Sequence, residues 1–296
     1  MSYLWDKKSE GDPGARELEA LLAGEKFSGL AFPPAASSRR GARRAVATVA
    51  ARLVAACAAF VVLRPRDVVK VSGSSQARTL ASGEWLETSA PVTLTLAREI
   101  GVVEVRGDSR VRVQRVDGEQ QRLELARGQL HAVVNAPPRL FVVDTPSATA
   151  VDLGCEYTLE VQRDGSTRLD VLSGRVVLEG AGRSTTVLAG MWAVSRPGAA
   201  PQVAIDAQAT PAFVTAVQRL AVEPRDVELA ALALSQADKR DAVTLWQLRS
   251  RTESEVREQV DARLRELVAV PSSAPDEAVW QACDSARTGV APAPQK

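Results

Sequence analysis

From residue 66 to residue 205, apolar and polar residues alternate with a period of two in many short runs. Val92, Leu94 and Leu96 form one such run, and turn residues such as Gly174 separate the runs at regular intervals. Successive side chains of a strand point to opposite faces, so this alternation predicts half-buried β-strands. We therefore expect an all-β central domain at residues 66–205, with many short strands in a β-solenoid or sandwich-like arrangement.

Between residues 210 and 287 the period changes to that of an α-helix. Val256, Val260 and Leu264, for example, form an apolar stripe on one helix face. The expected helix starts are Thr210-Pro211, Pro224, Asp238 and Thr252 with Glu255 in capping-box spacing, and a weaker helix runs from Pro275 to Ala286. Short connections predict a region of α-helical hairpins at residues 210–287, and residues 288–296 are expected to be a disordered tail.

Ala45–Leu63 is the candidate transmembrane helix. As a helix it is about 28 Å long, close to the thickness of the hydrocarbon core. Arg52 near its centre costs about 3 kcal/mol, and the apolar residues of the run return about the same amount. A cleaved signal peptide fits less well, because 44 residues precede the run. A buried soluble helix is the other alternative, although the run is apolar nearly all round.

Residues 1–44 are expected to form a cytoplasmic tail. The residues that flank the predicted span give a small excess of positive charge on the N-terminal side, which favours a cytoplasmic N-terminus: Arg39, Arg40, Arg43 and Arg44 come before it, and Arg64, Arg66 and Lys70 after it. Asp12-Pro13 is a helix-start signal, and Leu18, Leu21 and Leu22 follow at helical spacing.

The short amphipathic helix of this tail has no neighbouring core to cover its apolar stripe. Leu18, Leu21, Leu22 and the nearby Trp5 are therefore our candidate partner-binding residues. The alternative is that the segment is frayed or rests on the membrane, since an isolated helix of this length is marginal in water.

The composition argues against several classes of function. The chain has 37 Lys and Arg residues against 36 Asp and Glu, so its net charge of +1 offers no overall attraction for nucleic acid. His131 is the single histidine, which makes a His-based catalytic site or a zinc site hard to assemble. We expect no enzyme activity, no cofactor and no metal. His131 itself is interpreted as an outward polar residue of a strand.

Three cysteines are present without a CxxC pair: Cys57, Cys155 and Cys283. Cys155 and Cys283 would both lie outside the membrane in the topology above. They either pair in an oxidising compartment or remain separate buried thiols, and the sequence alone does not decide between the two.

The β-region resembles the FecR family of extracytoplasmic signal-transducing proteins over roughly residues 79–195. Four segments carry the resemblance in the family's order, and Ser109 and Val111 match a further turn: Leu125–Leu130, Phe141–Pro146, Leu153–Leu159 and Val171–Val176. Cys155 and Tyr157 stand where the family has Thr and Phe. The glycines of these segments fit turns, so the motif residues are interpreted as determinants of the fold.

The resemblance implies a single-pass inner-membrane protein whose cytoplasmic tail binds an extracytoplasmic-function sigma factor. It also implies a periplasmic body that senses an envelope or outer-membrane protein, often in iron uptake. The chain departs from the family in its short tail and in its helical C-terminal region. The leading hypothesis is an anti-sigma-factor-like regulator, and the alternative is a structural or scaffolding envelope protein without a sigma-factor partner.

Overall fold

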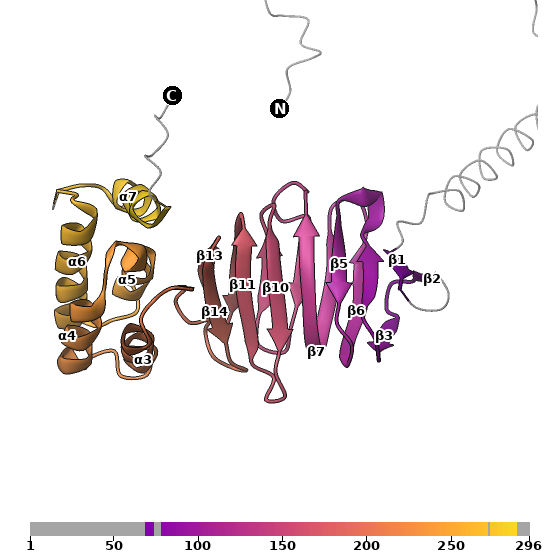
Figure 1. Ribbon diagram of the computed structural model, residues 1–296, viewed down its shortest axis with the longest axis horizontal. Helices are drawn as coiled ribbons and strands as arrows, with labels where there is room; N and C mark the ends of the chain where they lie inside the picture. The colour runs from indigo at the N-terminus through magenta and orange to yellow at the C-terminus, as the bar shows by residue number, and fades with distance from the viewer. Residues whose placement is uncertain (1–68, 74–77, 272, 289–296) are drawn as a thin grey trace, which may run out of the picture. The chain divides into compact units, whose positions relative to one another are not determined.

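The computed structural model describes residues 69–73, 78–271 and 273–288 (Figure 1). All of them lie within one compact unit, Arg66–Lys296. Fifteen strands come first along this part of the chain, and helices follow. The predicted change from strands to helices is confirmed.

The strands form two layers that share the long strand β7, Gln121–Val134. Layer A comprises β1 Val69–Ser72, β2 Arg78–Leu80, β4 Val92–Thr95, β5 Gly101–Val105, β10 Glu156–Val161, β11 Thr167–Ser173, β14 Met191–Ser195 and β15 Ile205–Asp206. Layer B comprises β3 Trp85–Thr88, β6 Ser109–Val116, β8 Phe141–Asp144, β9 Thr149–Asp152, β12 Arg175–Gly180 and β13 Arg183–Leu188. A 3₁₀ turn, η1 (Ala97–Glu99), joins β4 to β5.

The two halves of β7 belong to different layers. Its first half pairs with β6 and β8, and its second half pairs with β5 and β10. The β7–β8 pair is parallel, whereas every other strand pair in the described ranges is antiparallel. A β-solenoid stacks its strands in parallel register, so this pairing corrects that alternative, and the sandwich-like arrangement is the one adopted.

Gly128 marks the point where β7 passes from layer B to layer A. Its φ of +91° favours glycine, and a Cβ atom there would lie 2.6 Å from the Cα atom of Ser109. The register against β6 shifts at the same place, because Arg110 faces Arg127 while Val111 faces Leu125. A β-bulge of this kind bends a strand, which allows β7 to serve both layers.

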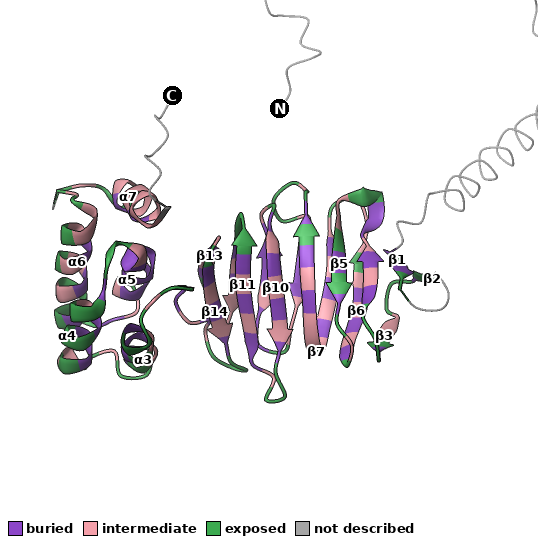
Figure 2. Ribbon diagram, in the orientation of Figure 1, coloured by how far each residue is buried: buried purple, intermediate pink, exposed green. Residues whose placement is uncertain are grey.

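The core between the layers consists of the alternating apolar residues that the sequence pattern singled out. Leu94, Val103, Leu159 and Leu178 are fully buried and belong to one continuous cluster. Figure 2 shows the alternation of buried and less buried residues along the strands. Each fully buried Leu or Val contributes roughly 1.5–3 kcal/mol, so the pattern supplies most of the driving force for the sandwich.

The helical region comprises α3 Pro211–Leu220, α4 Val227–Gln236, η2 Lys239–Asp241, α5 Ala242–Arg249, α6 Ser254–Val268 and α7 Asp276–Thr288. Thr210 caps α3 as predicted, since its hydroxyl accepts a hydrogen bond from the Phe213 N–H at 3.2 Å. Asp238 also caps as predicted, and it forms a capping box with Asp241 at η2.

Two expected helix starts were wrong. Pro224 does not open α4, because Asp226 caps that helix and accepts a hydrogen bond from the Leu229 N–H at 2.9 Å. Thr252 does not cap α6 either, because its hydroxyl points back to the carbonyl oxygen of Leu248 at 3.3 Å. Thr252 thus belongs to the end of α5, and Glu253 takes the N-cap position of α6.

Side chains of α5 and the following turn cover the free edge of layer B. The Gln247 side chain donates to the Thr186 carbonyl at 2.7 Å, and Arg251 donates to the Thr185 hydroxyl at 2.7 Å. An uncovered strand edge invites pairing with other chains, so these contacts protect β13 as well as attaching the helices.

Within the described ranges, none of the helices combines the length and the apolar character needed to cross a bilayer. The predicted span, Ala45–Leu63, and the tail, residues 1–44, lie outside the described residues.

Candidate functional site

The candidate partner-binding residues Trp5, Leu18, Leu21 and Leu22 lie outside the described residues. The structure therefore bears on the β-domain and the helices alone. Among the described residues, no group of three or more His, Cys, Asp or Glu side chains is suited to a metal ion.

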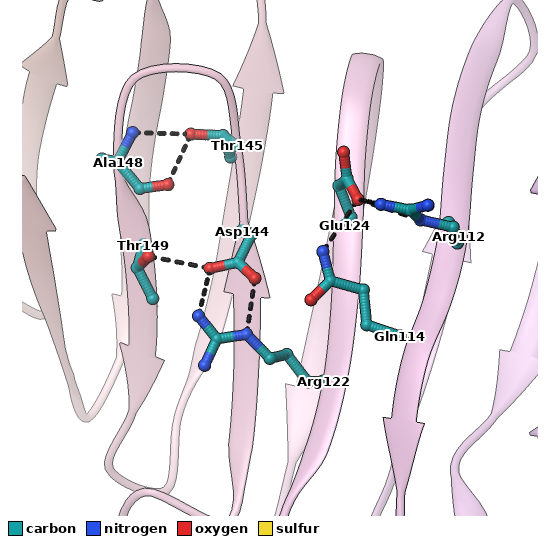
Figure 3. Close-up of polar contacts among 8 residues, drawn as sticks. All are labelled: Arg112, Gln114, Arg122, Glu124, Asp144, Thr145, Ala148 and Thr149. Carbon is teal, nitrogen blue, oxygen red and sulfur yellow. Dashed lines mark hydrogen bonds and ion pairs between the residues drawn. The ribbon is translucent and has the colours of Figure 1, made fainter. Parts of the chain in front are cut away.

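The outward face of layer B carries paired charges. Glu124 on β7 accepts hydrogen bonds from Arg112 and, at 2.8 Å, from Gln114, both on β6 (Figure 3). Arg122 binds Asp144 on β8 through two hydrogen bonds of 2.5 and 2.6 Å. Bidentate pairs of this kind are geometrically specific, and they hold the parallel β7–β8 pair in register.

The same face is electrically balanced. Arg110 pairs with Glu87 at 3.4 Å, and the guanidinium groups of Arg110 and Arg112 both lie over the Trp85 ring, at 4.3 and 4.6 Å from its centroid. Because its arginines already have partners, this face offers little net charge to another molecule. The contacts among its side chains are best explained as contacts that stabilise the fold.

Thr145, in the Phe141–Pro146 segment, belongs to a network of hydrogen-bonded hydroxyl groups. Thr145 Oγ1 donates to the Ala148 carbonyl at 2.7 Å and accepts from the Ala148 N–H at 3.0 Å (Figure 3). The Thr167 hydroxyl donates to Thr145 Oγ1 at 2.8 Å and accepts from the Ser147 hydroxyl at 2.7 Å. The network joins the β8–β9 turn to β11, which supports the interpretation of this segment as a fold determinant.

Asp152, directly before the Leu153–Leu159 segment, forms a buried cluster of ionisable groups with Cys155 and Tyr157 of that segment. Asp152 accepts hydrogen bonds from the Cys155 thiol and, at 2.9 Å, from the Gly154 N–H. Burial raises the pKa of Asp152 and raises the pKa of Cys155 to about 12. The Cys155 sulfur also lies 3.2 Å from the Arg175 carbonyl oxygen, a second acceptor for its single S–H proton, so the thiol takes the role of a hydroxyl donor at this family Thr position.

Tyr157, the second departure from the family, brings a hydroxyl group into this cluster. Its side chain is fully buried, and its hydroxyl has no hydrogen-bond partner in the described structure. Burial raises the pKa of Tyr157 well above its ordinary value, and the nearby Asp152 adds to that rise. The phenol is therefore neutral and acts as part of the core.

Both cysteines of the described region are free and buried. Cys155 lies before β10, and Cys283 lies on α7, where burial raises its pKa to about 12. Of the two alternatives left open by the sequence, the structure contains separate buried thiols. Neither has the depressed pKa of a reactive cysteine.

The outward face of layer A exposes large apolar side chains, whereas the outward face of layer B carries paired charges. Val102 on β5 and Val133 on β7 are direct cross-strand neighbours, yet they are 38% and 48% exposed. Leu172 on β11 is 52% exposed. Few large apolar residues are exposed elsewhere in the described ranges, and exposed apolar groups that gather on one face are typical of protein-contact surfaces.

His131 and two carboxylates accompany these apolar residues. His131 lies opposite Glu104 and Thr158, and its ring nitrogens are 3.2 Å from Glu156 Oε1 and 3.3 Å from Thr158 Oγ1. This position confirms the prediction of an outward polar strand residue. We call Val102, Glu104, His131, Val133 and Glu156 the layer A patch.

A polar hollow of about 780 Å³ lies beside the bulge in β7. Asp108 in the β5–β6 turn, Arg127 at the bulge, Glu160 near the end of β10 and Arg163 in the turn after it line the hollow. The pattern of glycines predicted each turn separately but not their convergence. None of these four side chains forms an ion pair with another described residue, so the hollow is lined by solvated charges of both signs.

Comparison with known proteins gives one match to a family. The family described as FecR protein matches residues 88–177. No curated protein sequence matches the chain.

Two crystal structures of a candidate anti-sigma factor from Parabacteroides distasonis ATCC 8503 are similar to part of the chain, both at 19% identity. The first has a TM-score of 0.35 and covers 45% of this chain and 63% of its own. The second has a TM-score of 0.32 and covers 46% of this chain and 61% of its own. This chain thus spans less than two thirds of either relative, and at these TM-scores neither bears on its fold or function.

The family match falls inside the part of the chain where four ordered segments carry the resemblance. It begins at the end of β3 and ends within β12, so it includes β7 and its bulge, the Thr145 network and the Tyr157 cluster. Residues 88–177 of this chain therefore form a FecR domain.

Proposed function

We propose that the chain is a membrane-anchored signal transducer of the anti-sigma-factor type. The observation that supports this most is the FecR domain at residues 88–177, because it lies beyond an apolar run, Ala45–Leu63, and a short N-terminal tail. In this proposal the tail is cytoplasmic, the run spans the bacterial inner membrane, and the β-domain and helices are periplasmic.

The cytoplasmic contact is assigned to the amphipathic stripe of the tail. Leu18, Leu21, Leu22 and Trp5 would bind an extracytoplasmic-function sigma factor, since an apolar helix face without a core of its own is suited to a groove on a partner. Burying three leucines supplies about 5 kcal/mol or more before the cost of ordering the tail.

Co-purification of the full chain with each extracytoplasmic-function sigma factor of its own organism tests this contact. We expect a complex with the wild-type chain and none with Leu18, Leu21 and Leu22 all changed to Ala. Val133→Thr, a change in the β-domain, serves as the control and should leave the complex intact. Lack of any complex with the wild-type chain would favour the alternative, a scaffolding protein of the envelope.

Cell fractionation tests the membrane anchor separately. The full chain should sediment with the inner membrane, and deletion of residues 45–63 should release it. Protease added to spheroplasts should cleave the β-domain but spare the tail. A wild-type chain recovered wholly in the soluble cytosolic fraction would contradict the proposed topology.

The extracytoplasmic contact is assigned to the layer A patch. Its exposed valines and carboxylates suit a partner surface that carries basic side chains beside aliphatic ones, whereas the charges of layer B are already neutralised. Val133→Thr combined with Glu104→Lys should abolish a sigma-dependent reporter response while leaving the sigma-factor complex intact. An unchanged response would place the contact elsewhere.

A further inference from the structure

Asp241 is a buried carboxylate at the junction between the β-domain and the helices. It ends η2 and directly precedes α5, and η2 packs against β15, α5 and α7. Its side chain is only 2% exposed. A hollow of about 570 Å³ lies beside it, lined by residues of β15, of the turn after it, of η2 and of α7.

The carboxylate is only half satisfied. One oxygen accepts a hydrogen bond from the Asp238 N–H at 3.0 Å. The other, Oδ1, is buried without a hydrogen-bond partner in the described structure. A buried anion with a bare oxygen is costly, whereas the protonated acid is neutral and loses little on burial.

Neighbouring charges do not offset this cost. The charged and titratable groups on the elements packed around Asp241 are Asp238 at the N-cap of η2, Lys239 and Arg240 on η2, Asp206 on β15, Arg249 on α5, and Asp276, Glu277, Cys283, Asp284 and Arg287 on α7. The arginines are engaged with other partners. Arg240 lies 3.1 Å from Asp238, Arg249 binds Asp276 at 2.8 Å, and Arg287 donates to the Ala189 carbonyl at 2.6 Å.

Burial raises the pKa of Asp241 to about 6. The Asp238 N–H lowers this pKa, whereas the charges of Asp238 and Asp206 raise it, and Arg240 opposes them only weakly. If the domain is periplasmic, as proposed above, the carboxyl group titrates in a pH range that it meets there, and it does so only while it is buried at the junction.

The element that begins at Asp241 is the one that attaches the helices to the strands. Thr244 donates to the Ala204 carbonyl at 2.7 Å, and the Gln247 side chain accepts from the Ala204 N–H at 2.8 Å. Gln247 also reaches Thr186 on the edge strand β13. Because Asp241 is the N-cap residue of α5, bringing its carboxylate into water moves the start of the same helix that makes these contacts.

The geometry points to a proton-linked junction: one proton bound by the Asp241 carboxylate tightens the attachment of α5 to the β-domain, and its loss loosens that attachment. The attached state binds the proton more strongly than the open state, in which the carboxyl group is solvated. Opening therefore becomes easier as the pH rises from about 4 to about 6, and above about pH 7 it no longer changes. The difference between a pKa of 3.8 and one of about 6 allows up to about a 100-fold change in the opening equilibrium.

Hydrogen exchange of the full chain between pH 4 and pH 8 tests this inference. The measured quantity is the ratio of exchange rates in wild type and Asp241→Asn for amides of Ala242–Arg249, because the ratio cancels the pH dependence of the exchange chemistry. We expect a ratio near one at pH 4 that rises up to about 100-fold by pH 7. Amides of Glu156–Val161 in the sheet should keep a constant ratio.

Two further variants complete the test. Asp206→Asn removes one negative neighbour and should move the midpoint of the wild-type profile to lower pH. Asp226→Asn alters the cap of α4 and should leave the wild-type profile unchanged in shape. A pH-independent ratio for Asp241→Asn, an equal change in the sheet amides, or an unmoved midpoint for Asp206→Asn would each overturn the proposal.

Discussion

Tyr157→Phe is expected to stabilise the protein, although it removes a polar group and adds nothing. The Tyr157 ring is fully buried among core residues, and its hydroxyl has no hydrogen-bond partner in the described structure. In water the same hydroxyl is hydrogen-bonded, so folding takes that bonding away without replacing it. The change to Phe also restores the residue that the FecR family has at this position.

The expected gain follows from two opposing terms. An unsatisfied buried hydrogen-bonding group costs about 1–3 kcal/mol. Removing one oxygen atom also leaves a small void, and the lost van der Waals contacts offset part of the gain in stability. We expect a net increase of about 1 kcal/mol in the free energy of unfolding, equivalent to a rise of about 2–4 °C in Tm for a domain of this size.

Urea unfolding monitored by circular dichroism measures this change. The midpoint should rise while the m-value stays the same, because the exposed surface does not change. Tyr157→Leu is the matched control: it removes the hydroxyl together with the ring and should destabilise the protein by about 2 kcal/mol or more through the cavity it leaves. A loss of stability in Tyr157→Phe would refute the reasoning, since it would show that the hydroxyl is bonded in the folded state.

Three further results are expected. Gly128→Ala should lower the free energy of unfolding in urea by about 2 kcal/mol or more, because the new Cβ meets the backbone of Ser109. Gly182→Ala is the control: Gly182 has a similar positive φ but open space around it, so the change should cost only about 1 kcal/mol. Asp144→Asn breaks the partly buried pair with Arg122 and should cost about 1 kcal/mol, less in 1 M NaCl; a loss independent of salt would contradict an ionic origin. In a Cys57→Ser chain, the two remaining thiols should not react with Ellman's reagent at pH 8 until urea unfolds the protein, because burial raises the pKa of each to about 12.

The sequence by itself determined the local features of this protein. Period-two alternation predicted the strands because side chains of a strand alternate between faces whatever the strand pairs with. The Thr210-Pro211 and Asp238 helix starts were predicted for a similar reason, since a cap involves only neighbouring backbone groups. The four ordered segments also identified the FecR domain, because turn glycines and core residues are visible in the chain itself.

The tertiary structure decided how these pieces meet. The alternation along β7 does not reveal that its two halves pair in different layers, nor that β8 lies parallel to it, because pairing depends on residues far apart in the sequence. The layer A patch was missed for the same reason: an outward valine such as Val133 has the same local pattern as an inward one. Its exposure is settled only by which face the neighbouring strands cover.

Burial of polar groups was likewise decided by packing. In the sequence, Asp241 resembles any other carboxylate near a helix start, and Tyr157 resembles an ordinary replacement of Phe. Their unusual properties arise because other elements surround them and remove water, leaving Asp241 Oδ1 and the Tyr157 hydroxyl without a hydrogen-bond partner. Solvation is a property of the whole fold, whereas strand and cap signals are properties of a few consecutive residues.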